Sequence, residues 1–170
     1  MIKFYKILTF ILQPVAYMVL MMSVSTLMLG LANPQLLLGG AVGLCVFIYL
    51  FCSFRFTLKA VVANQPVKRH LKDWIKVNSY IGFLQALLML FSVVMVLFVI
   101  PKSTFDTTFK TAYDMMVQQQ EEYRRMGSYE RFSSYMRIMI GCLGIFEAIL
   151  LVHIITGWRM LKGYSHYFVE

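Results

Sequence analysis

The sequence predicts an all-α integral membrane protein, a single transmembrane domain over residues 1–170 built as a four-helix bundle. Three observations predict this class. Hydrophobic residues make up 59% of the chain and charged residues only 14%, whereas soluble domains average about 25% charged residues. The apolar residues gather in four runs, each long enough for a helix that crosses a bilayer. The basic residues gather beside these runs, which is the pattern of membrane topology and not of nucleic-acid binding.

The four apolar runs set the expected spans and the segments between them. The first run contains Pro14, which predicts a kink because the proline ring removes a backbone hydrogen bond. A short turn joins the first two spans. A cytoplasmic connection of residues 55–78 joins the second span to the third, and an external segment of residues 101–137 joins the third to the fourth. The expected spans cover residues 7–32, 36–54, 79–100 and 138–158.

The second span begins with a cluster of glycines. Gly39 and Gly43 form a GxxxG pattern, and Gly40 lies beside it. Small residues at this spacing let two helix backbones approach closely. The pattern favours packing against the first span over a contact between two copies of the chain.

The distribution of basic residues predicts that both termini are cytoplasmic. The N-terminus, the 55–78 connection and the C-terminal tail together hold ten basic residues and two acidic ones, whereas the 101–137 segment holds six basic and five acidic residues. The positive-inside rule assigns the first group to the cytoplasm. The expected location is the plasma membrane, with the lipid bilayer itself as the first partner.

The cytoplasmic connection is expected to contain a basic amphipathic helix that starts at about Pro66, before the third span. Apolar residues recur at helical spacing between Val67 and Ile75, with basic residues around the other face. Such a helix fits an anionic leaflet, where each basic residue adds roughly 1 kcal/mol near the surface. Either the charges only fix the topology, which the pattern alone favours, or they form a docking patch for anionic lipid or an acidic partner. The candidate patch consists of Lys68, Arg69, Lys72, Trp74 and Lys76.

The external segment is expected to form an extracytoplasmic helical hairpin between the third and fourth spans. Ser103 and Asp106 make a capping box at its start, and an aromatic stripe at helical spacing follows as far as Tyr123. Gly127 is expected to end the first helix, and a second helix is expected to begin at about Tyr129 and to continue into the fourth span. The stripe can lie on the lipid interface, pack on the fourth helix or receive a partner.

Five polar residues form a candidate site within the membrane. Glu147 lies near the middle of the fourth span, where a central Asp costs about 2.5–3.5 kcal/mol on insertion scales. The other four are expected at one depth near the cytoplasmic ends of their helices: Gln13, Tyr49, Gln85 and His153. In a functional interpretation Glu147 titrates and His153 relays protons or contacts a substrate. In a structural interpretation, which we favour, these groups form interhelical hydrogen bonds worth about 0.6 kcal/mol each.

Catalytic and metal-binding patterns are missing from the sequence. It contains no Gly-rich phosphate loop and no HExxH, GxSxG or CxxC motif. All three cysteines lie inside apolar runs, which argues against a disulfide framework and a Cys/His metal site. We therefore expect neither an enzyme nor a bound cofactor or metal.

Three functional hypotheses remain. The leading one is a non-enzymatic accessory or scaffold subunit that binds other membrane proteins through its spans and its external helices. The alternative is a small oligomeric transporter or channel with Glu147 as its ionisable site. The third is a lipid-responsive sensor that works through the basic cytoplasmic helix. The expected partners are anionic lipid on the cytoplasmic side and either a membrane protein or a second copy of the chain.

Overall fold

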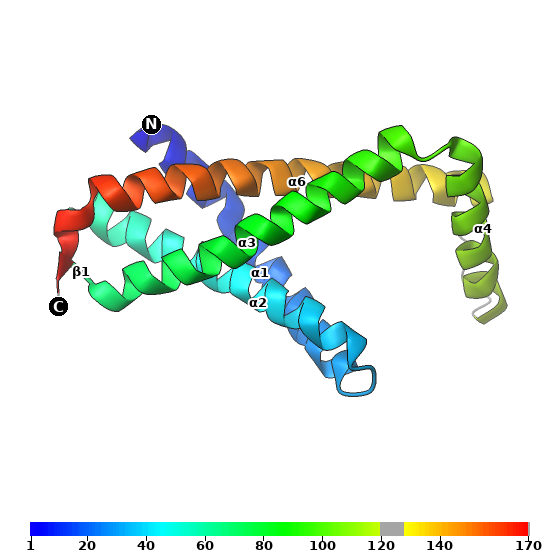
Figure 1. The fold of residues 1–170 in the computed structure, drawn as a ribbon, viewed down its shortest axis with the longest axis horizontal. Coiled ribbons are helices and arrows are strands. Elements are labelled where there is room, and N and C mark those ends of the chain that lie inside the picture. Colours follow the sequence, from blue (N-terminus) through cyan, green and yellow to red (C-terminus); the bar gives the residue numbers. More distant parts are fainter. Residues whose placement is uncertain (120–127, 170) are drawn as a thin grey trace. The chain divides into compact units, whose positions relative to one another are not determined.

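Helices form nearly all of the part of the chain that the computed structural model describes, residues 1–119 and 128–169 (Figure 1). The α-helices are α1 (Ile2–Gly30), α2 (Gln35–Phe56), α3 (Arg69–Val94), α4 (Lys102–Gln119) and α6 (Tyr129–Gly163). The shorter elements are the π-helical turns η1 (Thr57–Val62) and η2 (Met95–Val99), the 3₁₀ turn η3 (Ser165–Tyr167), and the strands β1 (Val67–Lys68) and β2 (Phe168–Val169).

Four of these helices are long and apolar enough to cross a membrane. They cover Ile2–Gly30, Gln35–Val62, Arg69–Val99 and Tyr129–Gly163, with lengths of 29, 28, 31 and 35 residues. The prediction of an all-helical chain with four helices that are long and apolar enough to span a membrane is confirmed. The fourth helix starts at Tyr129, as expected. The second continues through η1 to Val62, eight residues beyond its predicted end at residue 54. The prediction ended the span where the apolar run meets Arg55, but a helix can continue past the end of its apolar run.

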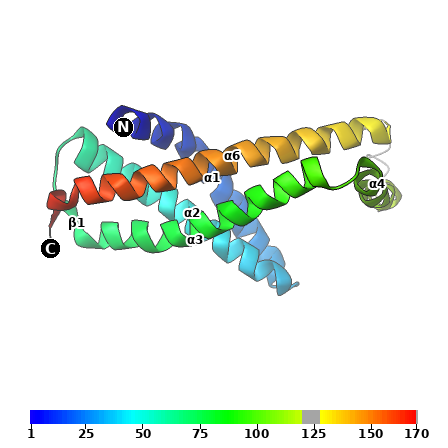
Figure 2. The same ribbon diagram turned by 45° about the horizontal axis from the view of Figure 1, so that its top comes forward.

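The chain divides into two compact units. One consists of Met1–Leu87 together with the chain from Ile149 onward, and the other of Leu88–Ala148. In the first unit, α1 and α2 run side by side as an antiparallel pair, which both views show (Figures 1 and 2). Pro14 lies within α1, and the helix continues through it.

Glycines allow the close approach of α1 and α2. A Cβ atom added at Gly40 would lie 2.6 Å from the Leu27 side chain, and one added at Gly43 would overlap the Ser23 hydroxyl. Gly39 has nothing within 4 Å of the same position. The expected packing of the second span against the first is therefore present, but it uses Gly40 and Gly43, and the assignment of Gly39 to the contact is wrong. Residues 39 and 40 point in directions about 100° apart on a helix.

Exposure along α1 separates a packing face from an apolar outer face. The buried face includes Tyr5, Leu12 and Ala16, at helical spacing. Met21 and Met22 are 68% and 70% exposed. Large side chains exposed in this number would be costly in water, and they agree with a helix whose outer face contacts lipid.

The segment before α3 differs from the expected helix. Residues Val67 and Lys68 form strand β1 and pair in parallel with Phe168 and Val169 of β2. The helix therefore begins at Arg69, and the predicted helix start at Pro66 is wrong. The partner strand lies about a hundred residues away in sequence, so local helical spacing does not reveal it. From Arg69 onward the basic amphipathic stretch is helical and continues without interruption into the expected third span.

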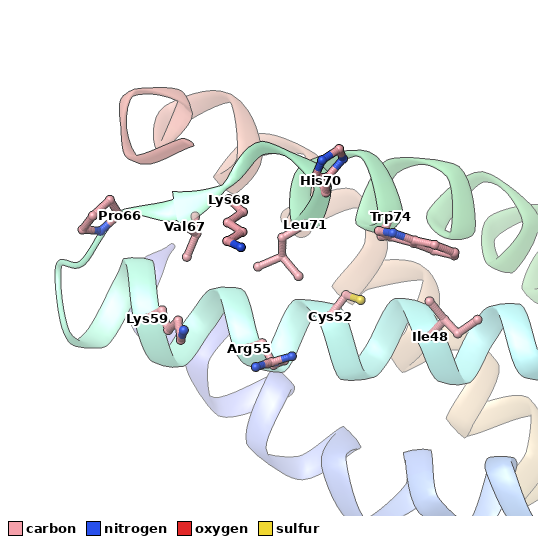
Figure 3. A pocket seen from close by; sticks show the side chains of 10 residues that line it. All are labelled: Ile48, Cys52, Arg55, Lys59, Pro66, Val67, Lys68, His70, Leu71 and Trp74. Carbon is pink, nitrogen blue, oxygen red and sulfur yellow. The ribbon is translucent and has the colours of Figure 1, made fainter. Parts of the chain in front are cut away.

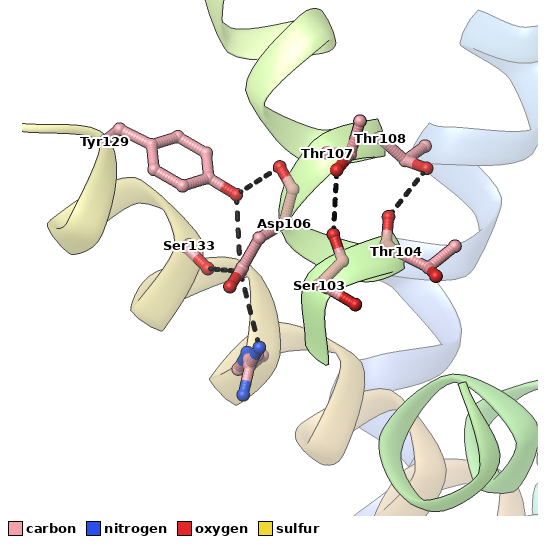
Figure 4. Close-up of polar contacts among 8 residues, drawn as sticks. Ser103, Thr104, Asp106, Thr107, Thr108, Tyr129 and Ser133 are labelled. Carbon is pink, nitrogen blue, oxygen red and sulfur yellow. Dashed lines mark hydrogen bonds and ion pairs between the residues drawn. The ribbon is translucent and has the colours of Figure 1, made fainter. Parts of the chain in front are cut away.

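In the second unit, Asp106 links α4 to the beginning of α6 (Figure 4). The Tyr129 hydroxyl donates to the Asp106 carbonyl over 2.8 Å and faces its carboxylate at 3.4 Å. Ser133 Oγ and Arg137 Nη2 donate to the same carboxylate oxygen over 3.3 and 3.4 Å. The Arg137 guanidinium also lies 4.6 Å from the centroid of the Phe105 ring. We call these five residues the Asp106 joint.

The joint replaces the capping box expected at the start of α4. The helix begins at Lys102, so Ser103 lies inside its first turn, and the Asp106 carboxylate is engaged by α6. Tyr123 and Gly127, which were expected to continue the stripe and to end the helix, lie outside the described residues.

Candidate functional site

His153 is the centre of a buried polar cluster in the first unit, which we call the His153 hub. Its Nδ1 atom lies 2.8 Å from the Tyr49 hydroxyl, and its Nε2 atom lies 2.9 Å from the Thr9 hydroxyl. The Tyr5 ring stacks on the imidazole with centroids 4.9 Å apart. His153 and Tyr49 are both fully buried. The hub therefore joins α1, α2 and α6 through one side chain.

The hydrogen bonds of Thr9 fix the proton arrangement of the hub. The Thr9 hydroxyl donates its one proton to the Tyr5 carbonyl over 2.8 Å, so it can only accept from the imidazole. Nε2 then carries the proton of a neutral ring, and Nδ1 accepts from the Tyr49 hydroxyl. Every polar atom of the imidazole is satisfied inside the protein, which is typical of a structural cluster.

The structure brings together part of the expected polar layer. Tyr49 and His153 meet, whereas Gln13 is buried in α1 with its side-chain amide outside the hydrogen bonds of the described residues. Gln85 is half-buried on α3. Thr9 and Tyr49 occupy both ring nitrogens of His153. Sequence reasoning missed Thr9 because a single threonine in an apolar helix is unremarkable and commonly bonds to its own backbone.

Glu147 belongs to the other compact unit, Leu88–Ala148. Its side chain is 2% exposed, on α6. The structure thus confirms that this acid is buried, while its proposed role as an ionisable transport site stays a prediction.

A basic groove of about 740 Å³ lies in the first unit (Figure 3). One wall is α2 with the first turn of η1, and the other is the segment from Pro66 to Trp74. Ten residues line it: Ile48, Cys52, Arg55, Lys59, Pro66, Val67, Lys68, His70, Leu71 and Trp74. We call this cavity the basic groove.

The groove has an apolar end and a charged end. Ile48, Cys52, Arg55 and Lys59 follow one another along one face of α2 and η1, at spacings of three and four residues (Figure 3). The distance from residue 48 to residue 59 is about 16 Å at 1.5 Å per residue. On the opposite wall, Lys68 lies near the charged end and Trp74 near the apolar end. The groove therefore changes from apolar to cationic along its length.

Within the described residues, no acidic side chain forms an ion pair with the cations of the groove. Arg55, Lys59 and Lys68 are exposed, and the lining contains no acidic residue. Within residues 1–119 and 128–169, the one ion pair is that of Arg137 with Asp106, in the other unit. A smaller hollow, which shares Lys68 and His70 with the groove, is also lined by Arg69 and Asp73. In the part of the chain that the structure describes, the cations of the groove have no acidic partner.

Only part of the predicted basic patch lines this groove. Lys68 and Trp74 do, whereas Arg69, Lys72 and Lys76 do not. Arg69 and Lys72 instead line a separate hollow with Ser165 and Phe168, and Lys76 is exposed on α3. Of the Arg, Lys and His residues that line the groove, the predicted patch includes Lys68 and lacks Arg55, Lys59 and His70. Arg55 and Lys59 continue the helical spacing of Ile48 and Cys52, which would have placed them on the same face of the helix. This spacing was overlooked because the second span was expected to end at residue 54.

In the described part of the chain, no group of three His, Cys, Asp or Glu side chains is placed to hold a metal ion. No family model, curated protein or solved structure matches the sequence or the fold. The four helices that are long and apolar enough to span a bilayer indicate a membrane protein.

Proposed function

We propose that this chain is a multi-pass membrane protein that binds an anionic phospholipid in the basic groove, without a catalytic step. The observation that supports the proposal is the groove itself, in which three cations without an ion pair among the described residues lie at one end and apolar side chains at the other. An anionic phospholipid has the matching arrangement of a charged phosphate on an apolar chain. The proposal is related to the third hypothesis from the sequence, a lipid-responsive sensor, because both require that the chain bind anionic lipid through basic residues on the cytoplasmic side.

Each end of the groove has a defined role in the proposal. Arg55 from α2, Lys59 from η1 and Lys68 from β1 would contact the headgroup phosphate, since Arg and Lys donate charge-assisted hydrogen bonds to phosphate oxygens. Leu71 and Trp74 would lie along the first part of an acyl chain, a depth at which tryptophan is common in membrane proteins. With roughly 1 kcal/mol for each basic residue, the three cations contribute roughly 3 kcal/mol. This corresponds to about a hundredfold preference over a zwitterionic lipid.

The proposal includes the membrane orientation given by the positive-inside rule. Both termini and the groove then face the cytoplasm, where the leaflet carries anionic lipid, and α4 lies outside. Cysteine labelling tests this orientation in a background with Cys45, Cys52 and Cys142 replaced by alanine. In intact cells, an impermeant maleimide should label Asp114→Cys on α4 but should label Ser165→Cys only after permeabilisation. The reverse pattern would refute the orientation.

Lipid binding can be measured through the fluorescence of Trp74. The chain has two tryptophans, so Trp158→Phe leaves Trp74 as the reporter. The protein is reconstituted into phosphatidylcholine vesicles that contain a small share of brominated phosphatidylglycerol. We expect stronger quenching than in vesicles with the same share of brominated phosphatidylcholine, because the groove would concentrate the anionic lipid beside the indole.

A charge-matched control separates the groove from general surface attraction. The combination Arg55→Gln, Lys59→Gln and Lys68→Gln should remove the excess quenching. The combination Lys3→Gln, Lys76→Gln and Lys162→Gln removes the same charge from exposed positions outside the groove and should retain it. Equal quenching by both brominated lipids in the parent protein would refute the proposed function. Equal losses in the two triple variants would assign the effect to net charge.

A scaffold role is the second candidate, and the Asp106 joint supports it. The joint holds α4 against α6 within one compact unit, while Met115 on α4 remains 57% exposed. A helix held in this way can present an apolar side chain to a partner membrane protein. Purification in mild detergent tests the idea. A partner retained by the parent chain and lost with Met115→Glu would support it, whereas a solitary monomer from native membranes would contradict it.

A further inference from the structure

The C-terminal segment Tyr164–Val169 packs onto the segment that carries Lys68 into the groove. Strand β2 pairs in parallel with β1, so that Phe168 lies opposite Val67 and Val169 opposite Lys68. A ladder of two residues is too short to hold by itself, since even an isolated hairpin is marginal in water. Other contacts must therefore fix the position of the C-terminal segment.

Phe168 supplies the main contact. Its ring stacks on Phe56 with centroids 5.6 Å apart and an angle of 7° between the planes, and Phe56 is fully buried at the end of α2. The Lys72 ammonium lies 5.2 Å from the centroid on the α3 side. Phe168 is thus held by the two helices that form the walls of the groove.

The loop between those helices is held from the same segment. Asn64 has a φ of +51°, a left-handed conformation that fits a tight turn. The Tyr167 hydroxyl donates to its side-chain oxygen over 3.3 Å. The C-terminal segment therefore contacts the chain at Asn64, before Lys68, and at Lys72, after it.

We propose that Phe168 is a positioning residue for the basic groove, and that it acts by holding β1 so that Lys68 faces the bound headgroup. The inference rests on the proposed function, because it concerns the affinity of the same site. Phe168 itself does not line the groove. Its effect on lipid should therefore pass through Lys68 and not through the cations of α2 and η1.

A double-mutant cycle tests this route with the Trp74 quenching measurement in Trp158→Phe protein. Lys68→Gln should weaken binding of brominated phosphatidylglycerol about fivefold, the loss of one surface cation. Phe168→Ala should weaken it by a similar factor and add nothing in the Lys68→Gln background. In the Arg55→Gln background, Phe168→Ala should weaken binding by the same factor as in the parent, because the effects of independent sites are additive in free energy. Phe168→Tyr, which keeps the ring, should bind as the parent does.

The matched arms distinguish positioning from damage to the fold. A general loss of structure would make Phe168→Ala non-additive with Arg55→Gln as well, and that result would overturn the inference. Normal binding by Phe168→Ala, or a full further loss in the Lys68→Gln background, would overturn the inference. If the parent protein shows no preference for the anionic lipid, the proposed function fails and the cycle cannot be read.

A spin label tests the positioning step in that case too. The label is attached at Lys68→Cys in the background without Cys45, Cys52 and Cys142. Phe168→Ala should then sharpen its spectrum, as expected for a more mobile β1, while Phe168→Tyr leaves it unchanged. An unchanged spectrum with Phe168→Ala would overturn the inference whatever the lipid measurement shows.

Discussion

The His153 hub and the basic groove are two polar regions of one compact unit, and they differ in whether the surrounding protein provides partners for their polar atoms. In the hub, Tyr49 and Thr9 satisfy both nitrogens of a fully buried imidazole. In the groove, Arg55, Lys59 and Lys68 are exposed and form no ion pair within the part of the chain that the structure describes. A satisfied buried cluster holds helices together, whereas exposed cations facing one cavity are available to a ligand.

The comparison changes which sequence hypothesis has the most support. The sequence favours a structural role for the intramembrane polar residues, and the hub agrees with this role because its imidazole has no hydrogen-bonding capacity left. The basic residues were interpreted mainly as topology signals, yet three of them converge on one groove. We therefore expect substitutions in the hub to change stability and substitutions in the groove to change lipid binding.

The largest expected effect on stability is that of His153→Ala. It leaves the Tyr49 hydroxyl buried without its partner, while Thr9 keeps its bond to the Tyr5 carbonyl. It also leaves a cavity where the imidazole stacked on Tyr5, and large-to-small substitutions in a core cost about 2–5 kcal/mol. We expect a loss of about 2–4 kcal/mol, measured by unfolding in mixed detergent micelles. His70→Ala, an exposed histidine of the groove, is the control and should change stability by less than about 0.5 kcal/mol. Similar losses for the two histidines would erase the contrast between the regions.

The effect of added lipid on stability tests whether the groove, unlike the hub, binds a ligand. Added phosphatidylglycerol should stabilise the parent protein in neutral detergent by about 2.7 kcal/mol at a hundred times the dissociation constant. Without lipid, the Arg55→Gln, Lys59→Gln and Lys68→Gln variant should be as stable as the parent. Added phosphatidylglycerol should increase its stability only slightly. Stabilisation of this variant to the same extent would show that the lipid acts elsewhere.

Substitution of Gly43 tests the helix pair on which the hub depends. Gly43→Val would overlap Ser23 on α1, and overpacking of this kind costs about 1–3 kcal/mol. The same change at Gly39, which has open space, should be nearly neutral apart from helix propensity. Thermal unfolding in detergent compares the two variants. Equal destabilisation would mean that the glycines act through the helix backbone and not through contact with α1.

The smallest expected effect is that of Asp106→Asn in the other unit. The side chains of Asp106 and Arg137 are 34% and 37% exposed, and exposed pairs contribute only about 0–1 kcal/mol. The Tyr129 bond to the backbone carbonyl remains in this variant. We expect faster amide hydrogen exchange in α4 with little change in global unfolding. A global loss comparable to that of His153→Ala would place the joint among the main stabilising contacts.

The sequence predicted the features that depend on local pattern. Apolar runs located the four long helices, and helical spacing placed the start of α6 at Tyr129. Depth counting brought Tyr49 and His153 to one level, because residues at equal distances from the same membrane face have similar heights. These inferences need only the rise of a helix and the cost of polar groups in lipid.

The remaining features depend on contacts between distant segments. Nothing near Val67 indicates that it pairs with Phe168, so a helix start at Pro66 was the natural but wrong expectation. Arg55 and Lys59 belong to the groove only because α2 continues past residue 54 and faces the start of α3. Helix rotation, which periodicity leaves open here, also decided that Gly40 and not Gly39 contacts α1.

The central claim, that the basic groove holds an anionic phospholipid, is tested most directly by native mass spectrometry of the full chain. The protein would be released from vesicles that contain equal amounts of phosphatidylcholine and phosphatidylglycerol. We predict a retained phosphatidylglycerol on the parent and on the Lys3→Gln, Lys76→Gln and Lys162→Gln control, and its loss from the Arg55→Gln, Lys59→Gln and Lys68→Gln variant. Equal retention of both lipids by the parent, or of phosphatidylglycerol by the groove variant, would contradict the claim.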